Sequence, residues 1–355
     1  MPKPCIRMFS NKIVLCYAGS LLLLAGVITF GLFYSSVVIP VPHIVHIVVE
    51  RLTGVQLLEE VPSSEYAIIW DIRLPRVLLA AGVGASLAIA GAAFQGLLRN
   101  PLADPYTIGV SSGASLGAVA VIFFQFTIVG LGAFTLPFIS IVSGFLTLML
   151  VFGLVRLSSR SMAVETIILA GIILSAFIGS IISLIISLGS QEEMTQIIYW
   201  LYGSVAMRGW SYVGLLAPFV FAGGLLLLTQ YRELNAMALG EEAAGHVGVH
   251  VQRGKIVILG GASMLTGAAV AVSGTIGFVG LVIPHMVRLV TGPDHQHVLP
   301  ISMITGAAFL VAADIIARTI IAPSELPIGV ITALIGAPLF AVLLIRNRIG
   351  KGKAA

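Results

Sequence analysis

Long uncharged stretches of the chain limit its fold more than any other feature. Residues 108–155 contain no Asp, Glu, Lys or Arg, and residues 256–287 form a second stretch of this kind. Charged residues make up about a quarter of a typical soluble domain, but here only 10% of 355 residues are charged and 58% are hydrophobic. Too few polar residues are present to cover a surface in water, so the sequence predicts a membrane protein.

The length of the apolar runs indicates helices. A helix needs about 20 apolar residues to cross a bilayer, whereas outer-membrane barrels show short alternating segments that are not found here. Gly130, Gly132 and Pro137 divide the first uncharged stretch, and residues 273–277 divide the second. We therefore expect an all-α polytopic membrane protein with a single transmembrane domain over residues 1–355. About ten spans are expected, at residues 13–33, 77–98, 108–127, 134–155, 165–188, 211–228, 256–273, 276–291, 300–321 and 327–345.

The basic residues predict the orientation. With the N-terminus in the cytoplasm, most of the 19 Lys and Arg residues fall on the cytoplasmic side, as the positive-inside rule requires. An even number of spans returns the C-terminus to the cytoplasm as well. The outer side then receives five arginines: Arg51, Arg73, Arg76, Arg208 and Arg318.

Three segments lie outside the expected spans. Residues 39–72 form an external stretch with a short interfacial helix near residues 43–58, and residues 189–204 form a second external stretch. Residues 229–255 are the longest internal loop. The net charge of +4 resides at the ends of apolar runs, so nucleic-acid binding is not expected.

A search for catalytic and metal sites returns none. A phosphate-binding loop needs four residues between its glycines, but five separate Gly248 from Gly254, and Ile256 follows Lys255. His246 and His250 have the spacing of zinc ligands without an evident third ligand. We expect no catalytic residue, no metal and no cofactor bound by this chain.

Two motifs in the spans concern helix packing and charge. Gly109, Gly113 and Gly117 repeat every four residues, which lets another helix approach closely. Asp314 and Arg318 are four residues apart, share a helix face and are expected to pair, either as a helix-end ion pair or as a functional group.

A mildly polar stripe, Gly179, Ser180, Ser183 and Ser187, follows one face of the fifth expected span. Its hydroxyls can return hydrogen bonds to their own helix. The stripe therefore fits either packing or the lining of a polar path.

Several motifs together resemble one family. They include residues 72–76 (IRLPR), 91–96 (GAAFQG), 99–105 (RNPLADP), 274–285 (GTIGFVGLVIPH) and 325–330 (ELPIGV). In order and spacing they resemble the FecCD-type permeases of ABC importers for iron–siderophore complexes, haem and cobalamin. The resemblance covers residues 70 to 345, and the first 70 residues match only as one span and an external loop.

The resemblance implies a transport subunit that is not itself an enzyme. It implies a homodimer in the bacterial cytoplasmic (inner) membrane, two cytoplasmic ATPase subunits that hold ATP and Mg, and an extracytoplasmic substrate-binding protein. The translocation pathway would lie at the dimer interface, where residues 179–187 would face it.

The resemblance also assigns roles to residues. Arg73, Arg76 and Arg318 match positions that meet carboxylates of the binding protein, a role suited to the planar guanidinium. The internal loop matches the helices that couple to the ATPase, with Leu234, Met237 and Leu239 as apolar contacts. The implied coupling residues are Leu234, Asn235, Met237, Leu239, Gly240, Glu241, Glu242, Ala243, Ala244 and Gly248.

The cargo stays open at this point. Ferric siderophore is preferred, haem is second and cobalamin third. The alternative is an ion-coupled secondary transporter, which the scarcity of carboxylates near the middle of the spans disfavours.

Overall fold

The computed structural model describes residues 4–35, 37–57, 61–158 and 163–352. These residues form helices and loops, without a strand among them. The α-helices are α1 (Pro4–Phe33), α2 (Val41–Thr53), α3 (Ser63–Tyr66), α4 (Leu74–Leu97), α5 (Val110–Phe124), α6 (Thr135–Ser158), α7 (Val164–Leu188), α8 (Gln191–Leu201), α9 (Gly209–Thr229), α10 (Tyr231–Ala238), α11 (Glu241–His246), α12 (Val251–Ser273), α13 (Val279–Thr291), α14 (His295–Thr319) and α15 (Ile328–Gly352). A π-helical segment, η1 (Ala67–Arg73), joins α3 to α4, and two short 3₁₀ segments are η2 (Pro105–Ile108) and η3 (Gly132–Phe134).

Each of the ten apolar ranges expected from the sequence falls on a helix. Seven helical segments in the described part are long and apolar enough to cross a membrane. The other three ranges fall on α5, α13 and α15, whose apolar parts are shorter. The main differences are at helix starts. For example, α14 begins at His295 rather than at residue 300, because the Asp294 side chain accepts a hydrogen bond from the backbone N–H of Gln296 and caps the helix.

The segments between the spans are more helical than expected. The external stretch 39–72 contains α2, α3 and η1, and α2 occupies residues 41–53 of the helix expected near 43–58. The second external stretch is α8, which starts with a capping box between Ser190 and Glu193. The internal loop contains α10 and α11 and ends where α12 begins at Val251.

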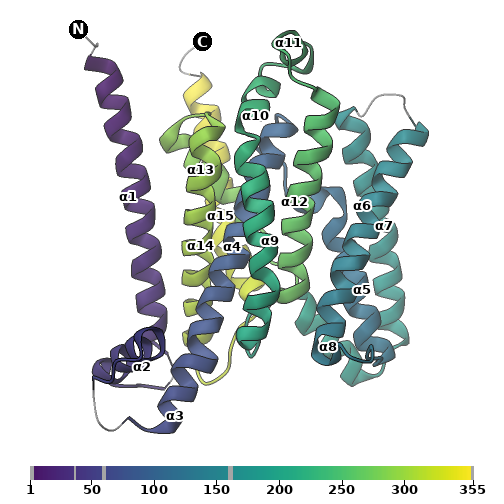
Figure 1. The fold of residues 1–355 in the computed structure, drawn as a ribbon. Coiled ribbons are helices and arrows are strands. Elements are labelled where there is room, and N and C mark those ends of the chain that lie inside the picture. Colours follow the sequence, from purple (N-terminus) through teal and green to yellow (C-terminus); the bar gives the residue numbers. More distant parts are fainter. Residues whose placement is uncertain (1–3, 36, 58–60, 159–162, 353–355) are drawn as a thin grey trace.

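Helix α4 is the central element of the bundle. It is buried almost continuously from Val83 to Leu97 and packs against α9, α12, α13 and α14. Glycines allow the closest of these contacts: a Cβ on Gly306 of α14 would lie 2.6 Å from the carbonyl oxygen of Gly84, and a Cβ on Gly91 would clash with Gly280 of α13. Helices α5, α6 and α7 pack together beside this core (Figure 1).

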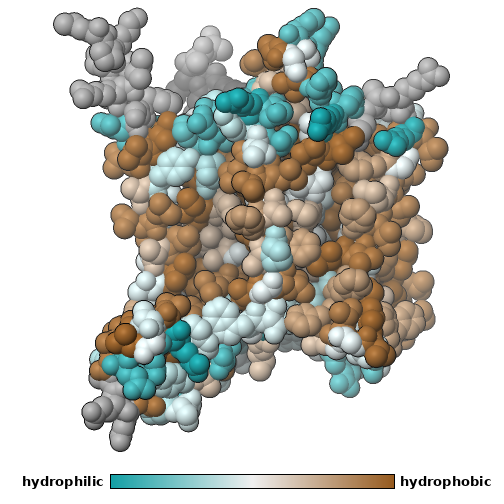
Figure 2. Space-filling model, in the orientation of Figure 1, coloured by the Kyte–Doolittle hydropathy of each residue, from teal (hydrophilic) through white to brown (hydrophobic). Residues whose placement is uncertain are grey.

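The bundle has two polar ends and an apolar middle. Figure 1 shows α10, α11, the start of α1 and the end of α15 at one end, which we call the hairpin end. The opposite end carries α2, α3 and α8. Figure 2 shows hydrophobic side chains across the middle of the visible face and hydrophilic ones at both ends. This distribution suits a protein that crosses a bilayer.

The close contact of α4 with α14 yields a first prediction. We expect Gly84→Val to lower the stability of the purified protein by about 1–3 kcal/mol or more, because the new side chain overlaps the backbone of Gly306. The measurement is thermal unfolding in detergent. Gly153→Val in α6 is the matched control, since no atom lies within 4 Å of its added Cβ. Equal losses in the two variants would contradict the packing argument.

Candidate functional site

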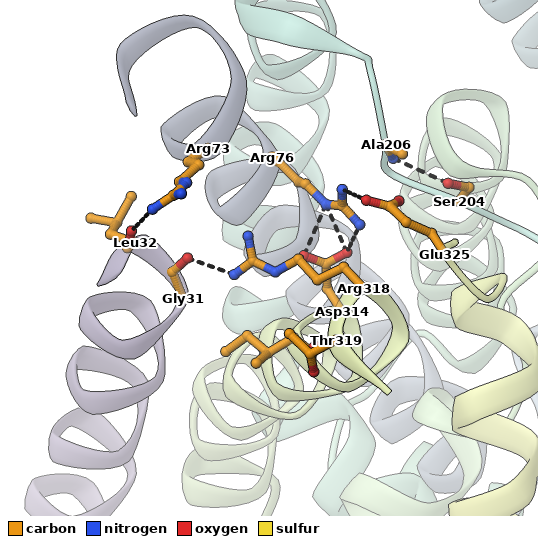
Figure 3. Close-up of polar contacts among 11 residues, drawn as sticks. Gly31, Leu32, Arg73, Arg76, Ser204, Ala206, Asp314, Arg318, Thr319 and Glu325 are labelled. Atoms are coloured by element: carbon orange, nitrogen blue, oxygen red, sulfur yellow. Dashed lines mark hydrogen bonds and ion pairs between the residues drawn. The ribbon is translucent and has the colours of Figure 1, made fainter. Parts of the chain in front are cut away.

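An arginine–carboxylate cluster lies at the end opposite the hairpin. We call Arg73, Arg76, Asp314, Arg318 and Glu325 the arginine cluster. Arg76, in the first turn of α4, donates to both carboxylate oxygens of Asp314, from Nη2 at 2.8 Å and from Nε at 3.0 and 3.1 Å. Its Nη1 donates to Glu325 at 2.8 Å. Figure 3 shows the Arg76 guanidinium between these two carboxylates.

The remaining arginines tie the cluster to the end of α1. Arg318 lies 3.8 Å from Asp314 and donates to the carbonyl oxygen of Gly31 at 2.5 Å. Arg73 donates to the carbonyl oxygens of Leu32, at 2.9 Å, and Val37. These carbonyls belong to the last turn of α1 and the segment after it, so the cluster holds three parts of the chain together.

These contacts are needed because most of the charged side chains in the cluster are buried. The side chains of Asp314, Arg318 and Arg76 are 1%, 3% and 10% exposed, whereas Glu325 is 40% exposed. A charge taken out of water is tolerated only when it is paired and hydrogen-bonded. Asp314 is therefore a structural carboxylate held between two arginines.

The expectation that Arg73, Arg76 and Arg318 meet carboxylates of a binding protein stays a prediction, and the single chain shows which internal contacts these side chains make. All three turn inward and contact carboxylates or carbonyls of their own chain. The sequence indicated the Asp314–Arg318 pair, but it missed the closer Arg76–Asp314 contact and the role of Glu325. Asp314 was the residue from which a buried arginine contact could have been predicted, because a carboxylate inside an apolar span needs a cationic partner.

At the hairpin end, α10 uses its apolar face to dock on the bundle. Leu234 is 0% exposed and Met237 is 2% exposed, and α10 packs against α4 and α14. In the single chain both residues therefore pack on their own bundle, and their role in an ATPase contact stays a prediction. Leu239, which follows α10, is 78% exposed and does face outward.

Asn235 links α10 to the start of α14. Its Nδ2 donates to Asp294 at 2.7 Å, and its Oδ1 accepts from the backbone N–H of His295 at 2.9 Å. Burial of Asp294 opposes ionisation, but the hydrogen bonds from Asn235 and Gln296 outweigh it and lower the pKa of Asp294. The carboxylate thus stays charged and keeps both its helix-capping and its inter-helix contact.

Helix α11 is held by one ion pair and leaves an exposed face. Glu241 accepts from Lys255 of α12 at 2.7 Å, and the Lys255 side chain is 1% exposed. Ala244 is buried beneath the helix, while Glu242 and Ala243 are exposed. Gly240 has φ = +121°, a conformation that side chains rarely adopt, which explains glycine at this turn. Gly248, with φ = +86°, makes the turn after α11.

The other sequence motifs lie on α5 and α7. Gly113 and Gly117 contact α6: a Cβ on Gly117 would lie 2.8 Å from the Ile139 carbonyl oxygen, and one on Gly113 would clash with Thr147. Gly109 lies at the start of α5 next to α7, where a Cβ would be 3.2 Å from the Gly171 carbonyl oxygen.

The polar stripe of α7 is exposed on the single chain. Ser180, Ser183 and Ser187 face outward, and Ser180 and Ser187 donate to carbonyl oxygens one turn earlier in their own helix. No atom lies within 4 Å of a Cβ built on Gly179. Among the described residues the stripe therefore packs against no other helix, and its role in a pathway stays a prediction.

Comparison with known proteins shows the family. Residues 20–346 match the FecCD transport family. The chain belongs to this family. The ABC transporter permease protein YvrB of Bacillus subtilis is 51% identical over 345 residues, which cover 97% of each chain. The cobalamin import system permease protein BtuC of Halobacterium salinarum is 44% identical over 284 residues, or 80% of this chain and 75% of BtuC.

A solved structure supports the assignment of the chain to this family. It is of a metal-chelate type ABC transporter in an inward-facing conformation. It matches with a TM-score of 0.80 and 34% identity, covering 92% of this chain and 98% of that chain. This FecCD chain is therefore a multi-pass permease subunit of an ABC importer, and its relatives are transport proteins rather than enzymes.

The arginine cluster yields a second prediction. Asp314→Asn leaves Arg318 without its carboxylate and Arg76 with only Glu325, so we expect a loss of about 3–5 kcal/mol in stability. Glu325→Gln removes a half-exposed pair and should cost about 1 kcal/mol or less. Thermal unfolding of both variants in detergent provides the comparison. A loss in Glu325→Gln as large as that in Asp314→Asn would contradict the assignment of Asp314 as the central carboxylate.

Proposed function

We propose that this FecCD chain forms a homodimer with ten spans per subunit and imports a ferric chelate, with ferric siderophore preferred over haem. The observation that carries the cargo class is the match, over 92% of this chain, to a transporter described as the metal-chelate type. Both termini and the hairpin end would lie in the cytoplasm of a bacterial cell, at the inner membrane. The basic residues support this orientation, because most of them gather at that end.

Two cytoplasmic ATPase subunits with ATP and Mg would drive the cycle, and an extracytoplasmic binding protein would deliver the cargo. The exposed surface formed by Leu239, Glu242, Ala243 and Val247 supports an ATPase contact at the hairpin end. Leu239 is 78% exposed and Val247 is 69% exposed, so both side chains are accessible to a partner. A short helical element with an exposed apolar residue is the form in which one protein fits a groove on another.

The second candidate cargo is cobalamin, which the name of the BtuC relative supports. The ion-coupled alternative has less support, because the carboxylate found in the ninth span, Asp314, is already neutralised by Arg76 and Arg318.

Coupling to the ATPase yields a third prediction. We expect Glu242→Lys to leave the protein folded, because the side chain is exposed, while uncoupling ATP hydrolysis from transport. The measurement is cargo uptake and ATPase activity of the whole complex in proteoliposomes. Leu234→Asp serves as the contrasting variant, since it places a charge at a 0% exposed position and should destabilise the fold instead. Normal coupled uptake by Glu242→Lys would argue against the hairpin as the ATPase contact.

The cargo is tested with the cognate binding protein. We expect it to bind one ferric siderophore tightly in a calorimetric titration and to give no response to haem or cobalamin. The reconstituted complex should then take up the same compound only with ATP, and dissipating the proton gradient should not stop it. Tight binding of cobalamin would show that the cargo is cobalamin and would leave the proposal of an ABC importer unchanged. Uptake without ATP would contradict the proposal that the complex is an ATP-driven importer.

A further inference from the structure

An apolar groove lies between α6 and α12, which pack against each other. Its volume is about 470 Å³, and ligand sites in proteins have volumes of about 300–1,000 Å³. Its lining covers residues 141–152 of α6 and 256–268 of α12, and Phe219 of α9 also contributes. We call it the α6–α12 groove. Close-packed proteins leave few voids larger than a water molecule, so a space of this size calls for an occupant.

The groove is apolar and open to the bilayer. Among the described residues that line it, Ser263 is the polar one. Phe145 is 59% exposed and Met149 is 41% exposed, and no atom lies within 4 Å of a Cβ built on Gly260. Water is held in a protein only where it has two to four polar partners. The molecules that can reach and fill this groove are therefore lipids.

The length of the groove suits an acyl chain. The lined part of α6, residues 141–152, measures about 17 Å at about 1.5 Å per residue. The hydrocarbon core of a bilayer is about 30 Å thick, so one leaflet contributes about half of that. The groove thus matches the depth to which the acyl chain of a single lipid reaches.

Two arginines continue the lining faces at the hairpin end. Arg156 follows Phe152 by four residues and Arg253 precedes Ile256 by three, so each lies one turn beyond the groove on the same helix face. Figure 1 shows the end of α6 and the start of α12 at this end of the bundle. Arginines at the ends of spans extend to the polar interface, where the lipid headgroups lie.

The charges of these two arginines are not met inside the described part of the chain. Both side chains are exposed, and no carboxylate among the described residues pairs with either of them. The neighbouring Lys255 differs, because it is buried and paired with Glu241. A lipid in the groove would thus meet two accessible guanidinium groups at the level of its headgroup.

From these observations we infer that the α6–α12 groove binds one anionic phospholipid. One acyl chain follows the groove, and Arg156 and Arg253 hold the phosphate. Arginine binds phosphate with two parallel hydrogen bonds, and basic pockets between membrane helices recognise anionic headgroups. The inference goes beyond the proposed function, since it requires only that the chain cross a bilayer and is independent of cargo and ATPase.

The test titrates the purified full-length permease in detergent with phosphatidylglycerol and with phosphatidylcholine that carries the same acyl chains. Native mass spectrometry counts the bound lipids and gives the dissociation constants. We expect one site that binds phosphatidylglycerol more tightly than phosphatidylcholine. Arg156→Gln and Arg253→Gln should each weaken the binding of phosphatidylglycerol by about 5-fold, the effect of one basic residue near a membrane surface, and should leave phosphatidylcholine unaffected.

Arg232→Gln is the matched control for charge. Arg232 is an exposed arginine of α10 at the same end, and it stacks over Tyr231 and is not among the residues next to the groove. Its loss should leave the binding of both lipids unchanged. Equal weakening by Arg232→Gln and the two groove variants would indicate general surface charge and overturn the inference, as would equal affinity of the wild type for the two lipids.

Gly260→Leu tests the groove itself. The new side chain meets no atom of the protein at its Cβ and occupies the groove, so we expect the site to be lost for both lipids while the protein stays folded. Gly153→Leu in α6 is the matched control, because its Cβ is equally free and Gly153 does not line the groove. Thermal unfolding without added lipid should be the same for the two variants. Unchanged lipid binding by Gly260→Leu would overturn the inference.

A last titration separates a lipid from a free phosphate. Glycerol 3-phosphate carries the phosphate without an acyl chain, and we expect it to bind far more weakly than phosphatidylglycerol. Binding as tight as that of the lipid, with the same dependence on Arg156 and Arg253, would show an anion site that makes no use of the groove and would contradict the inference.

Discussion

The carboxylate of Asp314 is the constraint on which one end of the bundle depends. An ion of this kind, 1% exposed in an apolar helix, must be paired, and its shortest contacts come from another element. Arg76 provides the main contact from α4, and Arg318 extends the pair to the Gly31 carbonyl at the end of α1. Glu325 then adds the segment before α15. One buried charge thereby fixes the mutual positions of α1, α4, α14 and the start of α15.

The same helix, α14, is held at its other end by a second charged contact. Asp294 caps α14 and accepts from Asn235 of α10. The hairpin end and the arginine cluster are therefore attached to opposite ends of one helix, which also packs closely on α4 through Gly84 and Gly306. The Asn235 contact thus links α10 to the same 25-residue helix that carries Asp314.

The sequence predicted the helices well because bilayer thickness sets the length of apolar runs, and it predicted the two polar ends because charges are confined to those ends. It failed where an answer depends on a distant partner. Arg76 at a helix end can point outward or inward, and the residue that decides is 238 positions away. Likewise, the apolar face of the short helix α10 can meet its own bundle or another protein. The spacing of Leu234 and Met237 is the same in both cases, and only the fold shows that the bundle takes them.

These two internal contacts change where recognition must occur. Arg76, Asp314 and Leu234 hold elements of the single chain together, so the proposed partners are expected to contact residues that these internal contacts leave accessible. At the hairpin end those residues include Leu239 and Val247. Neither of them lies in the arginine cluster or in the buried face of α10. The buried charges and close helix contacts thus fix the bundle, and the short connecting segments between helices carry the residues that stay accessible.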